Sequence, residues 1–165
     1  MPITEKRAIL ACPCEQVWKV VTSLTETSWR SDISRCEVIE PGKRFVEYTN
    51  TGVATAFTIT ACEPMHRYEF DMENENMHGH WTGMFYQRGA ATEIEFTENV
   101  TAKKFFLRPF VKAYLKRQQA AYVSDLKRAL GLDTYSYKEG ENSCYGNEIA
   151  TYQISRCLRT RRSKS

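Results

Sequence analysis

Residues 103–130 read KKFFLRPFVKAYLKRQQAAYVSDLKRAL, and Gly131 follows them. At the 3.6-residue period of an α-helix, this stretch has one apolar stripe and a polar opposite side. The stripe contains Val111, Leu115, Tyr122, Leu126 and Ala129, widened by Leu107, Phe110, Tyr114 and Ala121, and the opposite side contains Lys112, Lys116, Gln119 and Lys127. Pro109 suits the first turn of a helix, and Gly131 suits the left-handed position after its end. The stretch therefore predicts one amphipathic helix over 109–130 that covers a sheet.

Two polar residues, Gln118 and Asp125, interrupt the apolar stripe beside Tyr114 and Tyr122. A buried polar group needs a hydrogen-bonding partner or a water molecule. One interpretation is that both residues lie at a hydrated margin of the helix and bind strand ends or basic side chains. The other is that the helix covers a cavity into which Gln118 points, with Asp125 in a structural role.

The residues before this helix form short runs of alternating apolar and polar residues, separated by turn-forming pairs such as Pro41-Gly42 and Arg88-Gly89. This pattern predicts an antiparallel meander with one buried face. The expected strands are 3–11, 34–39, 44–48, 53–62, 67–72, 78–87 and 92–100. Pro13 marks the start of a helix over 14–24, and residues 25–33 predict a second short helix or a turn. The expected class is therefore α+β.

The composition is that of a folded domain, with 42% hydrophobic and 12% aromatic residues and a net charge of +3. We expect a cytoplasmic protein, because no apolar run is long enough to span a bilayer and no signal peptide is visible. The basic residues of 156–164 are either a solvated end or a segment that touches an anionic surface. Residues 1–153 lack the basic face of a nucleic-acid-binding domain, so we expect no nucleic-acid partner for the domain. Both a monomer and a homodimer are compatible with the sequence.

A series of short motifs runs along the chain. They are, in chain order, Ala11-Cys12-Pro13, Val17-Trp18, Trp29-Arg30-Ser31-Asp32, Glu37, Glu47, Gly79-His80-Trp81-Thr82, Thr92, Phe96-Thr97-Glu98, Tyr122-Val123-Ser124-Asp125-Leu126 and Leu130-Gly131. This series resembles the START-like (SRPBCC) superfamily and, within it, the polyketide cyclase/dehydrase branch. Each motif alone is short, but their order and spacing extend over residues 1–131. The resemblance does not include residues 132–165, which we expect to be an extension, polar and then basic, either partly disordered or with one added strand.

The resemblance implies a helix-grip fold, in which a curved antiparallel sheet of about seven strands wraps around the long C-terminal helix. It also implies two short helices after the first strand and a hydrophobic cavity between sheet and long helix. Members of the superfamily bind lipids, sterols, polyketides or hormones, and a minority catalyse cyclisation, dehydration or hydrolysis. The cavity walls expected here are Glu47, Phe57, Ile59, Tyr68, Phe70, Trp81, Phe85, Phe96, Tyr114, Gln118 and Tyr122.

Few groups are candidates for acid–base chemistry. Glu47 faces the cavity if Phe45 does, and faces solvent if the strand is shifted by one residue. His80 is a second candidate. Glu98 shares the strand face of its apolar neighbours, and we expect it to pair with Arg30 or with Lys103-Lys104.

Metal and cofactor chemistry have no recognisable motif in this sequence. His78 and His80 share a strand face but lack a further ligand, so we expect no metal. We also expect no cofactor, because no glycine-rich phosphate loop and no nucleophile motif are present.

Three functions stay open. The first is a carrier or sensor that binds a small hydrophobic ligand, such as a lipid, a sterol or a polyketide-like molecule. The second is a cyclase or dehydratase that uses a cavity carboxylate or a histidine as general acid or base. The third is an interaction module with a collapsed cavity. We expect the first, and the sequence leaves open whether any reaction is catalysed.

Overall fold

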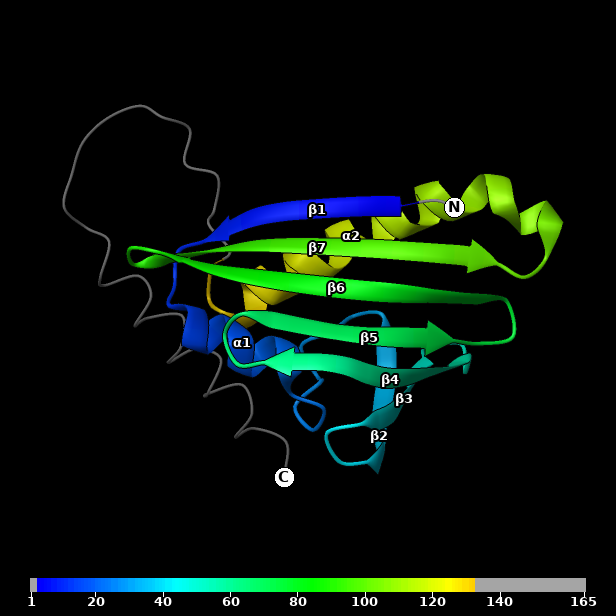
Figure 1. The fold of residues 1–165 in the computed structure, drawn as a ribbon, viewed down its shortest axis with the longest axis horizontal. Helices are drawn as coiled ribbons and strands as arrows, with labels where there is room; N and C mark the ends of the chain where they lie inside the picture. The colour runs from blue at the N-terminus through cyan, green and yellow to red at the C-terminus, as the bar shows by residue number, and fades with distance from the viewer. Residues whose placement is uncertain (1–2, 133–165) are drawn as a thin grey trace, which may run out of the picture. The chain divides into compact units, whose positions relative to one another are not determined.

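The computed structural model describes residues 3–132, which form one antiparallel sheet and two α-helices (Figure 1). The strands are β1 Ile3–Leu10, β2 Ile33–Glu40, β3 Arg44–Thr49, β4 Ala54–Glu63, β5 Arg67–Glu73, β6 Met77–Arg88 and β7 Ala91–Ala102. The helices are α1 Cys14–Thr22, the single-turn 3-10 helix η1 Phe105–Leu107 and α2 Arg108–Ala129. Each strand boundary lies within two residues of its predicted position. The expectations for the C-terminal extension fall outside the described residues, apart from Leu132.

The sheet has seven strands in the order β1-β7-β6-β5-β4-β3-β2, which confirms the predicted α+β helix-grip architecture. Successive strands from β2 to β7 pair with their neighbours in sequence, and β1 closes the series by pairing with β7. Figure 1 shows α1 and the chain after it crossing from the β1 edge towards β2 at the opposite edge. Residues 23–32 form turns and bends there, so the expected second short helix is replaced by the alternative, a turn.

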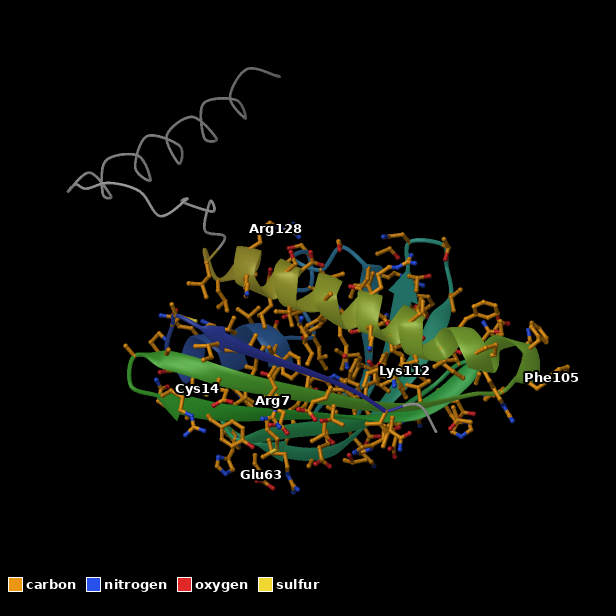
Figure 2. All side chains as sticks on the ribbon, turned by 90° about the horizontal axis from the view of Figure 1, so that it is seen from above. Arg7, Cys14, Glu63, Phe105, Lys112 and Arg128 are labelled. Atoms are coloured by element: carbon orange, nitrogen blue, oxygen red, sulfur yellow. The ribbon has the colours of Figure 1, made fainter. Side chains whose placement is uncertain are left out.

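One face of the sheet is turned towards α2. The alternation of buried and more exposed residues along β7 shows which side chains point to that face. Every second residue of β7, from Thr92 to Ala102, is buried, and the residues between them are more exposed. Figure 2 shows α2 lying across this inner face, with side chains projecting into the space between helix and sheet. The alternation follows from strand geometry, because successive side chains point to opposite faces.

Helix α2 has the predicted ends but a different packed side. Pro109 lies in its first turn, and Gly131 after it has a left-handed φ of 70°. The buried residues are Leu115, Gln119, Val123, Asp125 and Leu126. Gln119, predicted to be on the exposed side, is therefore buried, whereas Ala121 and Ala129 of the predicted stripe are exposed.

The helix packs on β1 and β7 along one edge, and its other apolar edge lies over a cavity. The apolar stripe predicted from the sequence combines these two edges. Its centre is therefore rotated away from the side of α2 that contacts the sheet.

The core is closed at one end of the sheet by α1. Val17 is fully buried there, and the Trp18 ring meets the Phe85 ring edge to face with centroids 5.1 Å apart. Aromatic pairs in this arrangement contribute beyond their buried area. No helix within residues 3–132 is long and apolar enough to cross a membrane.

Candidate functional site

A cavity of about 480 Å³ lies between the inner face of the sheet and α2. Its walls come from β3–β7, from α2 and from the turn that follows α1. Aromatic side chains supply much of the apolar surface: the rings of Phe70 and Trp81 stack with centroids 4.8 Å apart, and those of Phe45 and Phe57 stack at 4.7 Å. A volume of this size is in the range of small-molecule sites.

Arg30 lies at the centre of a charged cluster in the cavity wall. It comes from the turn after α1, and its guanidinium forms a two-point contact with Asp32, Nε to Oδ1 at 3.0 Å and Nη2 to Oδ2 at 2.6 Å. Its Nη1 donates to Oε1 of Glu47 on β3 at 2.6 Å, and the guanidinium lies 5.2 Å from the centre of the Tyr122 ring. The Arg30 and Glu47 side chains are 14% and 12% exposed. Three of the five N–H donors of Arg30 thus bind two carboxylates, which balance its charge.

The electrostatic balance of this cluster follows from burial. Burial by itself lowers the pKa of Arg30, but Glu47 and Asp32 outweigh it, so the pKa of Arg30 is raised and the guanidinium stays charged. Burial raises the pKa of Glu47, and the charge of Arg30 opposes part of that rise. Buried charges require this kind of pairing, since one left alone would cost several kcal/mol.

Glu98 on β7 is a second buried carboxyl in the cavity wall, only 8% exposed. Its one hydrogen bond within the described residues comes from Nε2 of Gln119, at 3.4 Å. Burial raises the pKa of Glu98 to about 7, and the Gln119 hydrogen bond only partly offsets that rise. The expected ion pair with Arg30 or with the lysines at 103 and 104 is not formed, because Arg30 is engaged elsewhere and Lys103 binds Glu73.

Most of the residues predicted for the cavity line it. They are Glu47, Phe57, Tyr68, Phe70, Trp81, Phe96, Tyr114, Gln118 and Tyr122. Two others do not. Phe85 faces inwards but is only 1% exposed and is covered by Trp18 of α1. Ile59 packs against the core farther along β4, towards the β4–β5 turn. Both lie on the predicted face, but beyond the end of the cavity.

His80, the other acid–base candidate, lies on the outer face of the sheet. Its Nδ1 is 2.7 Å from Oδ1 of Asp71, and its side chain is 41% exposed. The alternation of β6 requires this orientation, because the adjacent Trp81 is buried in the cavity wall. His80 is therefore excluded from cavity chemistry. Within residues 3–132, no group of histidine, cysteine and acidic side chains is arranged to hold a metal ion.

Asp125, the second polar interruption of α2, has a structural position. It lies outside the cavity lining, and its Oδ2 accepts hydrogen bonds from the backbone N–H and the hydroxyl of Ser31, at 2.8 and 2.7 Å. These bonds fix the turn that carries Arg30 against the C-terminal half of α2.

A protein family described as "Polyketide cyclase / dehydrase and lipid transport" matches residues 1–131. The chain belongs to this family. The match extends over most of the chain and includes all the strands and helices described above. No curated protein matches the sequence.

Solved structures share the fold of this polyketide cyclase/dehydrase family member at low sequence identity. A START superfamily protein from Mycobacterium smegmatis superposes with a TM-score of 0.72 at 11% identity, covering 80% of this chain and 99% of that one. A conserved protein from Geobacillus kaustophilus gives 0.68 at 10% identity, covering 78% and 95%. The di-domain ARO/CYC BexL from the BE-7585A biosynthetic pathway gives 0.69 at 13% identity, covering 82% of this chain and 48% of BexL. At such identities the likeness establishes the fold alone.

Sequence reasoning missed several cavity residues of this family member. The sequence gives no sign that Arg30 and Asp32 line the wall, because they lie in a turn without a periodic pattern. Gln119 was assigned to the wrong side of α2. The inward orientation of Glu98 could be predicted, because Glu98 lies two residues after Phe96 on the same strand and so points to the same face, which lines the cavity.

Proposed function

We propose that this protein binds a small hydrophobic molecule, such as a lipid, a sterol or a polyketide-like compound, in the cavity between the sheet and α2. The observation that carries the proposal is the cavity itself: about 480 Å³ of space walled by stacked aromatic rings and containing a few buried polar groups. Such a combination is typical of ligand sites, where apolar surface supplies affinity and the polar groups orient the ligand. A cytoplasmic location, expected from the sequence, is part of this proposal.

The charges of the cavity wall favour a ligand with an uncharged polar group over one with a carboxylate. Among residues 3–132, Arg30 is the one basic side chain in the lining, and Asp32 and Glu47 already balance its charge, so an anionic head group gains little attraction from it. Glu98 adds a third acidic group and would repel a ligand carboxylate whenever it is ionised. When protonated, Glu98 can instead donate a hydrogen bond to a hydroxyl or a carbonyl oxygen.

A pair of neighbouring substitutions tests ligand binding. Val111 lines the cavity, whereas Lys112 is the next residue on α2 and is exposed. Val111→Trp fills the cavity, and Lys112→Trp adds the same side chain outside it. With Nile red as an uncharged fluorescent probe, we expect Val111→Trp to weaken binding by about tenfold or more, because the indole ring takes space that the probe would occupy. Lys112→Trp should bind like the wild type.

Equal affinity of both variants would show that the probe binds elsewhere, and no binding by the wild type would contradict the proposal. Displacement of Nile red by dodecanol and by dodecanoic acid, which have the same chain length, then tests the preference for an uncharged group. We expect the alcohol to compete better. The opposite order would contradict the charge argument but leave ligand binding intact.

One observation favours a second function, acid–base catalysis as a cyclase or dehydratase. A carboxyl in the cavity with a pKa of about 7 can both give and take a proton at neutral pH, and Glu98 has this property. A β-hydroxy ketone probe tests it, because loss of water forms a conjugated enone with strong ultraviolet absorption. Glu98→Gln should abolish the reaction, and Glu95→Gln on the outer face of the same strand should not. A rate no higher than in buffer would remove this candidate.

A further inference from the structure

The start of α2 carries an exposed aromatic cluster. Phe105, Phe106 and Phe110 are 77%, 57% and 69% exposed, and Tyr114 is 53% exposed. These are the four exposed aromatic side chains of residues 3–132, and they fall within ten consecutive positions. Large apolar groups gathered on a surface in this way mark an interaction site.

Basic residues surround this cluster and acidic ones are absent from its sequence. Residues 103–117, called here the docking segment, contain Lys103, Lys104, Arg108, Lys112, Lys116 and Arg117 and no aspartate or glutamate. All six are exposed, and among them only Lys103 forms an ion pair within the described residues, with Glu73. The docking segment also contains the N-terminal end of α2, where the helix dipole adds positive potential.

The docking segment lies at an opening of the cavity. Leu107, Phe110 and Tyr114 belong to the cavity lining, yet the last two are more than half exposed, so the cavity reaches the surface beside them. Figure 2 shows Phe105 beside the start of α2 and Arg128 towards the other end of that helix. The rings of Phe105 and Phe106 contact each other edge to face, with centroids 5.9 Å apart.

We propose that the docking segment binds the surface of an anionic lipid bilayer, with Phe105 and Phe106 inserted at the interface and the cavity opening turned towards the membrane. Aromatic rings flanked by lysine and arginine are the composition of segments that lie in the headgroup region. Each basic side chain near an anionic surface strengthens binding by roughly fivefold. A second copy of this chain is a poor partner for the segment, because two such basic surfaces would repel each other.

Docking does not depend on what the cavity binds. The exchange of a ligand between cavity and bilayer would rest on the proposed function, but adhesion to the membrane can be measured without any ligand.

Flotation of the full-length protein with vesicles tests the proposal. One set of vesicles contains phosphatidylcholine alone, and the other also contains phosphatidylglycerol. The test variant is Phe105→Ser/Phe106→Ser, which removes two exposed rings that are not in the cavity lining. The matched control is Ile3→Ser/Ile9→Ser, which removes two side chains that are 57% and 70% exposed on β1, the strand at the sheet edge.

We expect the wild type to float with the anionic vesicles and to bind the neutral ones at least about tenfold more weakly, given several basic side chains near the surface. The Phe105/Phe106 variant should lose about tenfold or more of the anionic-vesicle binding, and the Ile3/Ile9 control should keep it. Circular dichroism of both variants should match that of the wild type, because all four side chains are exposed.

Three results would overturn the proposal. The wild type could fail to bind anionic vesicles, or it could bind neutral vesicles equally well. The Phe105/Phe106 variant could bind like the wild type, which would assign the binding to another basic segment, such as 156–164. Loss of Nile red binding with vesicle binding intact would instead count only against the proposed function.

Discussion

Replacing Glu98 by glutamine should make the protein more stable at alkaline pH and leave its stability at acidic pH almost unchanged. Burial raises the pKa of Glu98 from an ordinary 4.5 to about 7 in the folded protein. Between these two pH values the folded state holds a proton that the unfolded chain has released. The free energy of unfolding therefore falls as the pH rises through this interval.

The magnitude follows from the size of the pKa change. A difference of one pKa unit corresponds to about 1.4 kcal/mol, so the rise in the pKa of Glu98 corresponds to roughly 3 kcal/mol. This cost is absent below pH 4.5 and fully present above pH 7. Glutamine has the same shape and no charge to bury, and its carbonyl oxygen can still accept the hydrogen bond from Gln119.

Urea unfolding of the wild type and of Glu98→Gln, at several pH values on both sides of pH 7, measures this difference. We expect the variant to be more stable by about 3 kcal/mol at the alkaline end, and the two proteins to converge at the acidic end. Glu95→Gln is the control, because it removes a carboxyl from the outer face of the same strand. Parallel pH profiles for the wild type and Glu98→Gln would refute the argument that Glu98 is buried without a cationic partner.

Other substitutions test the supports of the cavity. Arg30→Met leaves the largely buried Glu47 and the partly exposed Asp32 without their cation and should lower the free energy of unfolding by about 3 kcal/mol; a loss below about 1 kcal/mol would mean that water solvates the cluster. Gly83→Ala places a methyl group against the ring of Trp81, so the ring must move; we expect a cost of about 1–3 kcal/mol in urea unfolding and a shifted tryptophan fluorescence, and an unchanged spectrum would contradict the contact. Asp125→Ala removes the acceptor of the Ser31 N–H and should cost about 1–3 kcal/mol by the same measurement; a loss below about 0.5 kcal/mol would show that water replaces the carboxylate.

The wrong predictions about the site concern contacts between distant segments. Glu98 was expected to pair with Arg30 or with a lysine, but its partner is Gln119, on the side of α2 assigned to solvent. Helical periodicity groups residues by face but does not say which edge of that face rests on a sheet. His80 is a different case, because the strand alternation that turns Trp81 inwards already excludes it.

The sequence by itself determined the strands, the two helices and the family, because local alternation, proline and glycine positions and motif order are properties of neighbouring residues. Strand parity also assigned most of the rings to one face of the sheet, and the family resemblance implied that this face lines a cavity. Only the tertiary structure decided where the cavity ends and which polar groups enter it. Arg30 meets Glu47 across 17 positions of the chain, and Ser31 meets Asp125 across 94. Such pairs depend on how the turn after α1, β3 and α2 pack together, and a local pattern contains no information about that packing.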